Sequence, residues 1–115
     1  MTYRIEISPT AMADVEDVFM WLQGYSVERA HRWVRGCYEA MLTLEKFPGR
    51  CPLAVESRYM QVTVRQLLYK KQYRILFTLV GGADDADFQG TVRINRVLRA
   101  SQERLTDIGQ LGQNN

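Results

Sequence analysis

Basic side chains crowd three strand-like segments in the second half of the chain, at 62–71, 72–80 and 91–99, and no Asp or Glu lies among them. The basic residues of these segments are Arg65, Lys70, Lys71, Arg74, Arg93, Arg96 and Arg99. Guanidinium and ammonium groups bind phosphates and carboxylates, so the pattern predicts a surface for RNA or for an acidic protein. The chain has a formal net charge of only +2, so its acids must lie elsewhere. The alternative interpretation is a solvated sheet face whose arginines pair with acidic residues of the helices.

Side chains that transfer protons near neutral pH are scarce. His31 is the only histidine, and it falls in a predicted helix away from the basic strands, which favours a surface position. Arginine stays protonated at every working pH, and Lys70, Lys71 and Tyr69 would act as acids or bases only with a perturbed pKa. The residue types therefore favour binding over acid–base catalysis.

Neither the acids nor the cysteines have the spacing of metal ligands. Asp84, Asp85 and Asp87 lie close together but lack the ligand order of a calcium loop, so a solvated turn is favoured. Cys37 lies on the apolar stripe of a predicted helix, which is typical of a core residue, and Cys51 is the only other cysteine. We expect both thiols to be reduced in a cytoplasmic protein, with no metal and no cofactor.

The composition is that of one globular domain. The chain has 115 residues, 46% of them hydrophobic and 24% charged, enough for a core without disulfide or metal cross-links. No apolar run approaches the roughly 20 residues that span a bilayer, so we expect no membrane partner. The N-terminus alternates like a strand and lacks the apolar stretch of a secretory signal. We expect a single domain over 1–105 and a flexible tail over 106–115, which is rich in Gly, Gln and Asn.

The order of the predicted elements is β-α-α-β-β-β. Residues 2–7 alternate as a strand, and Ser8 followed by Pro9 is typical of the start of a helix. After a short turn we expect a second helix from Ser26 to about Phe47. Three strands follow, at 62–69, 72–80 and 91–98. The predicted fold class is α+β, with an antiparallel sheet packed under a helix hairpin.

Periodicity assigns the two faces of the strands. Alternating apolar residues of the 72–80 strand predict its core side, and Arg74 falls on the opposite face. Arg96 is in phase with the apolar residues of the last strand, which predicts a bulge or the sheet edge there. The apolar positions of the 72–80 strand are Tyr73, Ile75, Phe77 and Leu79.

Two residues of the predicted helices are unusual. Gly36 lies inside the second helix at a cost of about 1 kcal/mol relative to Ala, which predicts a close contact between the two helices. Trp21 falls off the apolar stripe of the first helix. It is therefore either an exposed aromatic that anchors an interface or a contact to the neighbouring helix.

Six short motifs, taken in order, resemble the RelE/ParE family of bacterial toxin–antitoxin toxins, and the resemblance covers the chain to about residue 105. Each motif alone is loose, whereas their order and spacing together are more specific. The motifs are Ser8-Pro9-Thr10-Ala11, Asp14-Val15-Glu16-Asp17, Leu44-Glu45-Lys46-Phe47-Pro48-Gly49, Val64-Arg65-Gln66-Leu67, Tyr73-Arg74-Ile75-Leu76-Phe77 and Ile94-Asn95-Arg96-Val97-Leu98.

This resemblance implies a fold like that of a small microbial ribonuclease and one of two activities. RelE-like members cut mRNA in the ribosomal A site, whereas ParE-like members inhibit DNA gyrase. For the nuclease branch the resemblance implies catalytic roles for Arg65, Arg74 and Arg99, with Arg74 stabilising the phosphate and Arg99 standing where many relatives have His. No His or Tyr follows Tyr73, so the proton-transfer group of that branch is missing.

The departure from the nuclease pattern favours a ParE-like gyrase inhibitor, with a RelE-like ribosome-dependent mRNA endoribonuclease as the alternative. A third hypothesis is a basic binding module without toxicity. The resemblance also implies a cognate antitoxin, for which Trp21 is the candidate contact, and a homodimer is a further option. The candidate target- or phosphate-binding residues are Arg65, Lys70, Lys71, Arg74, Arg93 and Arg99.

Overall fold

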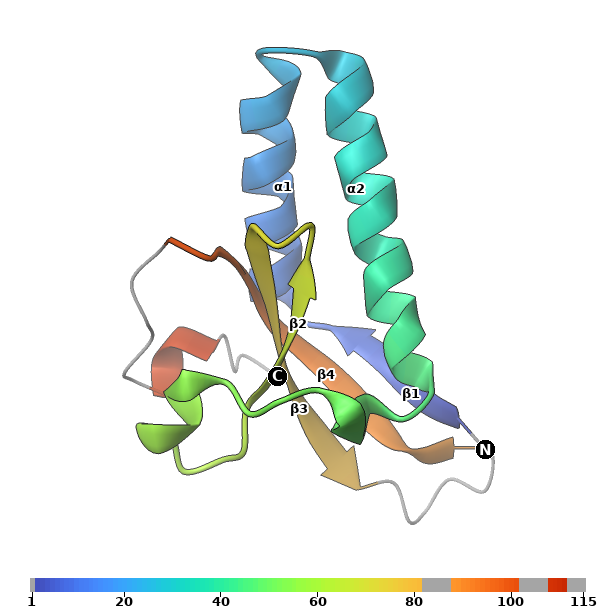
Figure 1. The fold of residues 1–115 in the computed structure, drawn as a ribbon, viewed down its shortest axis with the longest axis vertical. Helices are drawn as coiled ribbons and strands as arrows, with labels where there is room; N and C mark the ends of the chain where they lie inside the picture. The colour runs from blue at the N-terminus through green and yellow to red at the C-terminus, as the bar shows by residue number, and fades with distance from the viewer. Residues whose placement is uncertain (1, 82–87, 102–107, 112–115) are drawn as a thin grey trace.

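The computed structural model describes residues 2–81, 88–101 and 108–111, and in it a helix hairpin covers one face of a four-stranded sheet (Figure 1). The strands are β1 (Thr2–Ile7), β2 (Arg65–Tyr69), β3 (Tyr73–Gly81) and β4 (Phe88–Arg99), and the helices are α1 (Pro9–Gln23) and α2 (Val27–Leu42). Short 3-10 turns follow at Thr43–Glu45, Pro48–Arg50, Val55–Arg58 and Ile108–Leu111. The order β-α-α-β-β-β and the α+β class are confirmed. No helix in the described part is long and apolar enough to cross a membrane.

The sheet is mixed, and the prediction of an antiparallel sheet is wrong for its first strand. The strand order is β1-β4-β3-β2, with β2–β3 and β3–β4 antiparallel and β1 parallel to β4. Parallel neighbours need a long crossover between them, and the helix hairpin with β2 and β3 supplies it here. Only β2, β3 and β4 follow one another through short connections, and such connections favour antiparallel pairing. Their antiparallel pairing was therefore predictable.

A β-bulge in β4 lies where the sequence predicted one. Leu76 of β3 pairs with Arg96, whereas the next residue, Phe77, pairs with Ile94, so Asn95 is the extra residue. The bulge reverses the phase of the strand. Ile94 and Val97 therefore both reach the core under the helices, and Arg96 falls on the other face of the sheet.

The main core lies between the helix hairpin and the sheet. Tyr73, Ile75 and Phe77 are buried there, as predicted, and the Trp33 ring of α2 meets the Tyr73 ring edge to face at 5.0 Å. Leu79 is 37% exposed, so the core side of β3 ends before it. Leu79 continues the alternation of apolar residues along β3, but it is not buried in the core.

The opposite face of the sheet is covered around Leu76 and Leu98, so the prediction of an open basic surface is wrong for that part, whereas Leu68 and Val80 of the same face are about half exposed. Leu76 and Leu98 pack there in a second cluster with residues from the irregular segment after α2 and from the last 3-10 turn. Leu111 of that turn is 1% exposed. The prediction of a flexible tail is therefore wrong for Ile108–Leu111, which packs against the sheet. The other members of the cluster are Ala54, Met60 and Val64.

Residues 106–107 and 112–115 of the predicted tail, and Asp84, Asp85 and Asp87, lie outside the described residues.

Gly36 allows a close approach between α2 and β2, and not between the two helices as predicted. A Cβ atom at Gly36 would lie 2.2 Å from Tyr69 Oη. That hydroxyl donates a hydrogen bond to the Trp33 carbonyl oxygen at 2.8 Å. The missing side chain therefore lets a buried strand tyrosine bond to the helix backbone.

Candidate binding groove

Arg74 is buried in an ion pair, which corrects its predicted role as a phosphate or target contact. Its Nη1 donates to Glu56 Oε2 at 2.8 Å, its Nη2 contacts Glu56 Oε1, and its Nε donates to Gln66 Oε1 at 3.0 Å. Arg74 is 7% exposed and Glu56 is fully buried. A buried, two-pronged pair of this kind holds the guanidinium in place, because separating it would leave a carboxylate uncompensated in the interior. Arg74 therefore anchors the segment before β2 to the sheet.

The other predicted strand arginines are also engaged within the chain. Arg65 Nη1 donates to the carbonyl oxygens of Cys51 at 2.7 Å and Gly49 at 3.3 Å. Arg93 donates to Glu6 Oε1 of the neighbouring strand through Nε at 3.0 Å and Nη2 at 2.6 Å. Arg93 is therefore paired with an acid of β1, whereas Arg65 is bonded to backbone carbonyl oxygens and not to an acid. The predicted catalytic set of Arg65, Arg74 and Arg99 does not converge on one open site.

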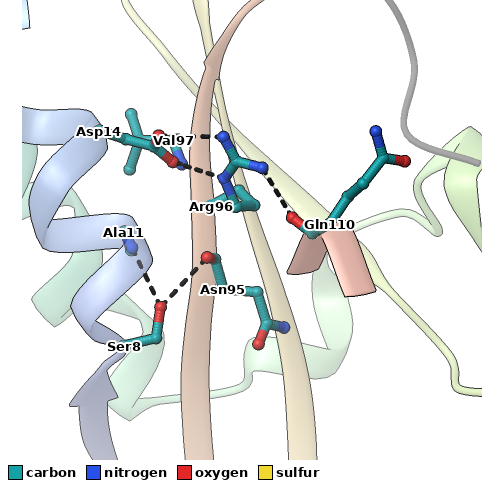
Figure 2. Close-up of polar contacts among 7 residues, drawn as sticks. All are labelled: Ser8, Ala11, Asp14, Asn95, Arg96, Val97 and Gln110. Carbon is teal, nitrogen blue, oxygen red and sulfur yellow. Dashed lines mark hydrogen bonds and ion pairs between the residues drawn. The ribbon is translucent and has the colours of Figure 1, made fainter. Parts of the chain in front are cut away.

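Arg96 joins three parts of the fold at the bulge (Figure 2). Its Nε and Nη2 donate to the two oxygens of Asp14 in α1 at 2.8 and 3.1 Å, and its Nη1 donates to the Gln110 carbonyl oxygen at 2.6 Å. Asp14 also accepts the Val97 backbone N–H at 2.9 Å. Ser8, the N-cap of α1, accepts the Ala11 N–H and donates to the Asn95 carbonyl oxygen. Asp14 and Ser8 together fix α1 to both sides of the bulge, so this cluster is structural.

A groove of about 750 Å³ lies where the helix hairpin meets the β2–β3 turn and the end of β4. That turn rises beside the two helices in Figure 1. Five basic residues surround the groove, and we call them the basic rim: Arg29, Arg32, Lys70, Lys71 and Arg99. Four aromatic residues line it, and we call them the aromatic wall: Trp21, Tyr25, Trp33 and Tyr73.

The groove gathers only part of the predicted site. Lys70, Lys71 and Arg99 of the candidate target-binding set lie in it, whereas Arg65, Arg74 and Arg93 do not. Sequence reasoning missed Arg29 and Arg32, which face the groove from α2. Their signal was two basic residues at helical spacing near the start of that helix, but only the folded chain places them opposite the turn.

Trp21 is a half-exposed aromatic, as one of the two alternatives for it predicted. Trp21 is 48% exposed, and its ring meets the Tyr25 ring edge to face at 5.3 Å. The Arg99 guanidinium carbon lies 4.7 Å from the centroid of the indole ring. The cation over the indole orients Arg99 at the groove. Behind it, the buried Trp33 indole N–H has no acceptor among the described residues.

The β2–β3 turn presents two lysines in a strained backbone. Lys70 and Lys71 have φ of 55° and 59°, and the Gln72 N–H donates to the Tyr69 carbonyl oxygen at 3.2 Å. This is the tight turn that the sequence predicted, of the type that favours Asn and Gly. Left-handed conformations cost a residue with a side chain about 1–2 kcal/mol. The chain keeps lysine at both positions in spite of that cost.

The groove has the chemistry of a binding site. No His, Asp or Glu lines it in the described part of the chain. His31 is exposed on α2 and its ring meets Phe19 at 5.1 Å, outside the groove. Beneath the wall, burial raises the pKa of Tyr69 and raises the pKa of Cys37 to about 12, so neither group exchanges protons near neutral pH. Cys37 is a core thiol, as predicted, and both cysteines are free.

The sequence matches no protein-family model and no curated protein.

Proposed function

We propose that this chain is the toxin of a type II toxin–antitoxin pair and that it acts in the cytoplasm by binding DNA gyrase, without cleaving RNA. The resemblance of the six motifs to the RelE/ParE family supports the toxin assignment. The architecture, two helices over a four-stranded sheet, is compatible with that family. In this proposal a cognate antitoxin neutralises the protein by covering Trp21, and the groove contacts the target.

The observation that carries the choice of binding over cleavage is the Arg74–Glu56 pair. A RelE-like nuclease would use the Arg74 guanidinium to stabilise negative charge on the phosphate. In this chain the Glu56 carboxylate already neutralises that guanidinium. Cleavage through a ribose 2′-hydroxyl also needs a base and an acid, which together contribute orders of magnitude in rate. Arginine supplies neither, because it stays protonated. A protein with such a site is better suited to hold a partner than to transfer protons.

The proposal is tested by inducing the chain in a bacterial host, mapping mRNA 5′ ends and measuring supercoiling by purified gyrase with the purified protein. We expect growth arrest, loss of supercoiling, and mRNA 5′ ends like those of uninduced cells. Codon-periodic cleavage within translated frames, with supercoiling unchanged, would make the endoribonuclease alternative correct. An absence of growth arrest, with both assays unchanged, would leave the basic binding module.

A further inference from the structure

We propose that the groove binds an acidic peptide segment of a partner protein, with carboxylates on the basic rim and apolar side chains against the aromatic wall. The inference deepens the proposed function and rests on it only for the identity of the partner. The binding chemistry follows from the groove itself and is testable with a peptide alone.

Charge complementarity is the first argument for an acidic segment. Elsewhere in the fold Arg74, Arg93 and Arg96 each pair with a carboxylate of the chain. At the groove, Arg29 and Arg32 have no ion pair with the described residues, and no acid lines the groove there. Cations of helix α2 and of the β2–β3 turn thus face one concave surface whose described lining has no carboxylate. A segment with several carboxylates would be attracted to it and oriented along it.

The strain at the turn is the second argument. Lys70 and Lys71 both adopt the left-handed conformation, which would suit Asn and Gly better. Their backbone is fixed from both sides, because the Gln72 N–H bonds to Tyr69 and the Ala100 N–H bonds to the Gln72 carbonyl oxygen at 2.7 Å. Strain that the surroundings maintain is commonly found where a side chain has to be presented to a ligand. Here it presents two ammonium groups at the edge of the groove.

The aromatic wall favours a peptide over a nucleic acid. Bases of a single strand stack on open ring faces. In this groove Arg99 covers one face of Trp21, and Trp33 and Tyr73 are buried, so Tyr25 alone of the aromatic wall is largely exposed and successive bases would lack a row of open ring faces. Apolar side chains need only contact area, which tilted rings and edges supply.

The test is direct binding of a short, fluorescein-labelled peptide made of Glu, Asp and Leu, measured by fluorescence anisotropy. A labelled DNA strand of matched charge is the competing probe. We expect the peptide to bind more tightly than the DNA strand. Binding should weaken as ionic strength rises from about 0.1 M to about 1 M, because the Debye length falls from about 10 Å to about 3 Å. Tighter binding of the DNA strand would overturn the proposal in favour of a nucleic-acid site.

Charge reversal then locates the site. Lys70→Glu with Lys71→Glu, and separately Arg29→Glu with Arg32→Glu, should each weaken peptide binding about tenfold or more. Two double variants are used, so that if circular dichroism shows that one is misfolded, the other still tests the site. Lys46→Glu with Arg58→Glu is the matched control, since both residues are exposed, lie outside the groove and change the charge equally. Equal losses in the control and the groove variants, or no peptide binding by the wild type, would refute the site whatever the outcome with gyrase.

Discussion

At the scale of one residue, Arg74 is a basic strand side chain that stabilises the fold through a buried ion pair. It was predicted on the face opposite the helices, and that placement is right. The partner that buries it, Glu56, lies 18 residues away in a segment without periodicity. Strand patterns encode which face a residue occupies, but not which distant charge meets it. The sequence therefore could not separate a phosphate contact from an internal ion pair.

Removing one member of this pair should destabilise the protein strongly. We expect Arg74→Ala to lower the free energy of unfolding by about 3–5 kcal/mol, because it leaves the Glu56 carboxylate buried without a partner. Replacing both members, with Arg74→Met and Glu56→Leu, should recover most of the loss. Urea unfolding followed by circular dichroism measures both. A loss for Arg74→Ala within the error of the wild-type value would mean that Arg74 is free for a ligand.

At the scale of elements, the contact between α2 and β2 depends on Gly36. Alanine normally favours a helix over glycine by about 1 kcal/mol. At Gly36 its Cβ would collide with Tyr69 Oη, so we expect Gly36→Ala to destabilise by about 1–3 kcal/mol. Gly49→Ala is the matched control, because nothing lies within 4 Å of a Cβ there. Adding Tyr69→Phe should relieve part of the Gly36→Ala loss, and thermal unfolding of the wild type and the three variants tests this. A more stable Gly36→Ala protein would contradict the contact.

The bulge in β4 is an element whose position depends on Asp14. Loss of its hydrogen bonds to Arg96 and Val97 should cost about 2–3 kcal/mol in Asp14→Ala, since bonds to charged groups are worth about 1.5–3 kcal/mol. Asp17→Ala, three residues along α1 and exposed, should change the stability by less than about 0.5 kcal/mol. Denaturant titrations compare the two. Equal effects would show that Asp14 does not stabilise the bulge.

Elements whose signals are local were predictable from the sequence. Ser8 and Pro9 start α1 as predicted, and Arg96, which is in phase with the apolar residues of β4, predicted a bulge or the sheet edge there. The helix after Ser26 ends at Leu42 and not near Phe47, which has a left-handed φ of 50°. The parallel pairing of β1 and the packing of Leu111 were not predictable, because each brings together segments that are distant in the sequence.

For the whole molecule, the groove combines predicted and unpredicted residues. Lys70, Lys71 and Arg99 were candidates because they lie in basic strand segments. Arg29 and Tyr25 were not, because a helix end and a strand turn become neighbours only when the sheet is assembled. The binding site is therefore a product of tertiary structure, and its chemistry is visible in the residue types only after the fold is known.

The measurement that tests the central claim most directly is inhibition of gyrase supercoiling as a function of protein concentration. The claim is that the protein inhibits gyrase by binding it through the groove. We expect wild type and the Lys46→Glu, Arg58→Glu control to inhibit equally. The Lys70→Glu, Lys71→Glu variant, folded to the same extent, should need about tenfold more protein. Inhibition by the groove variant at the wild-type concentration would contradict the account, and so would wild-type protein that leaves supercoiling intact.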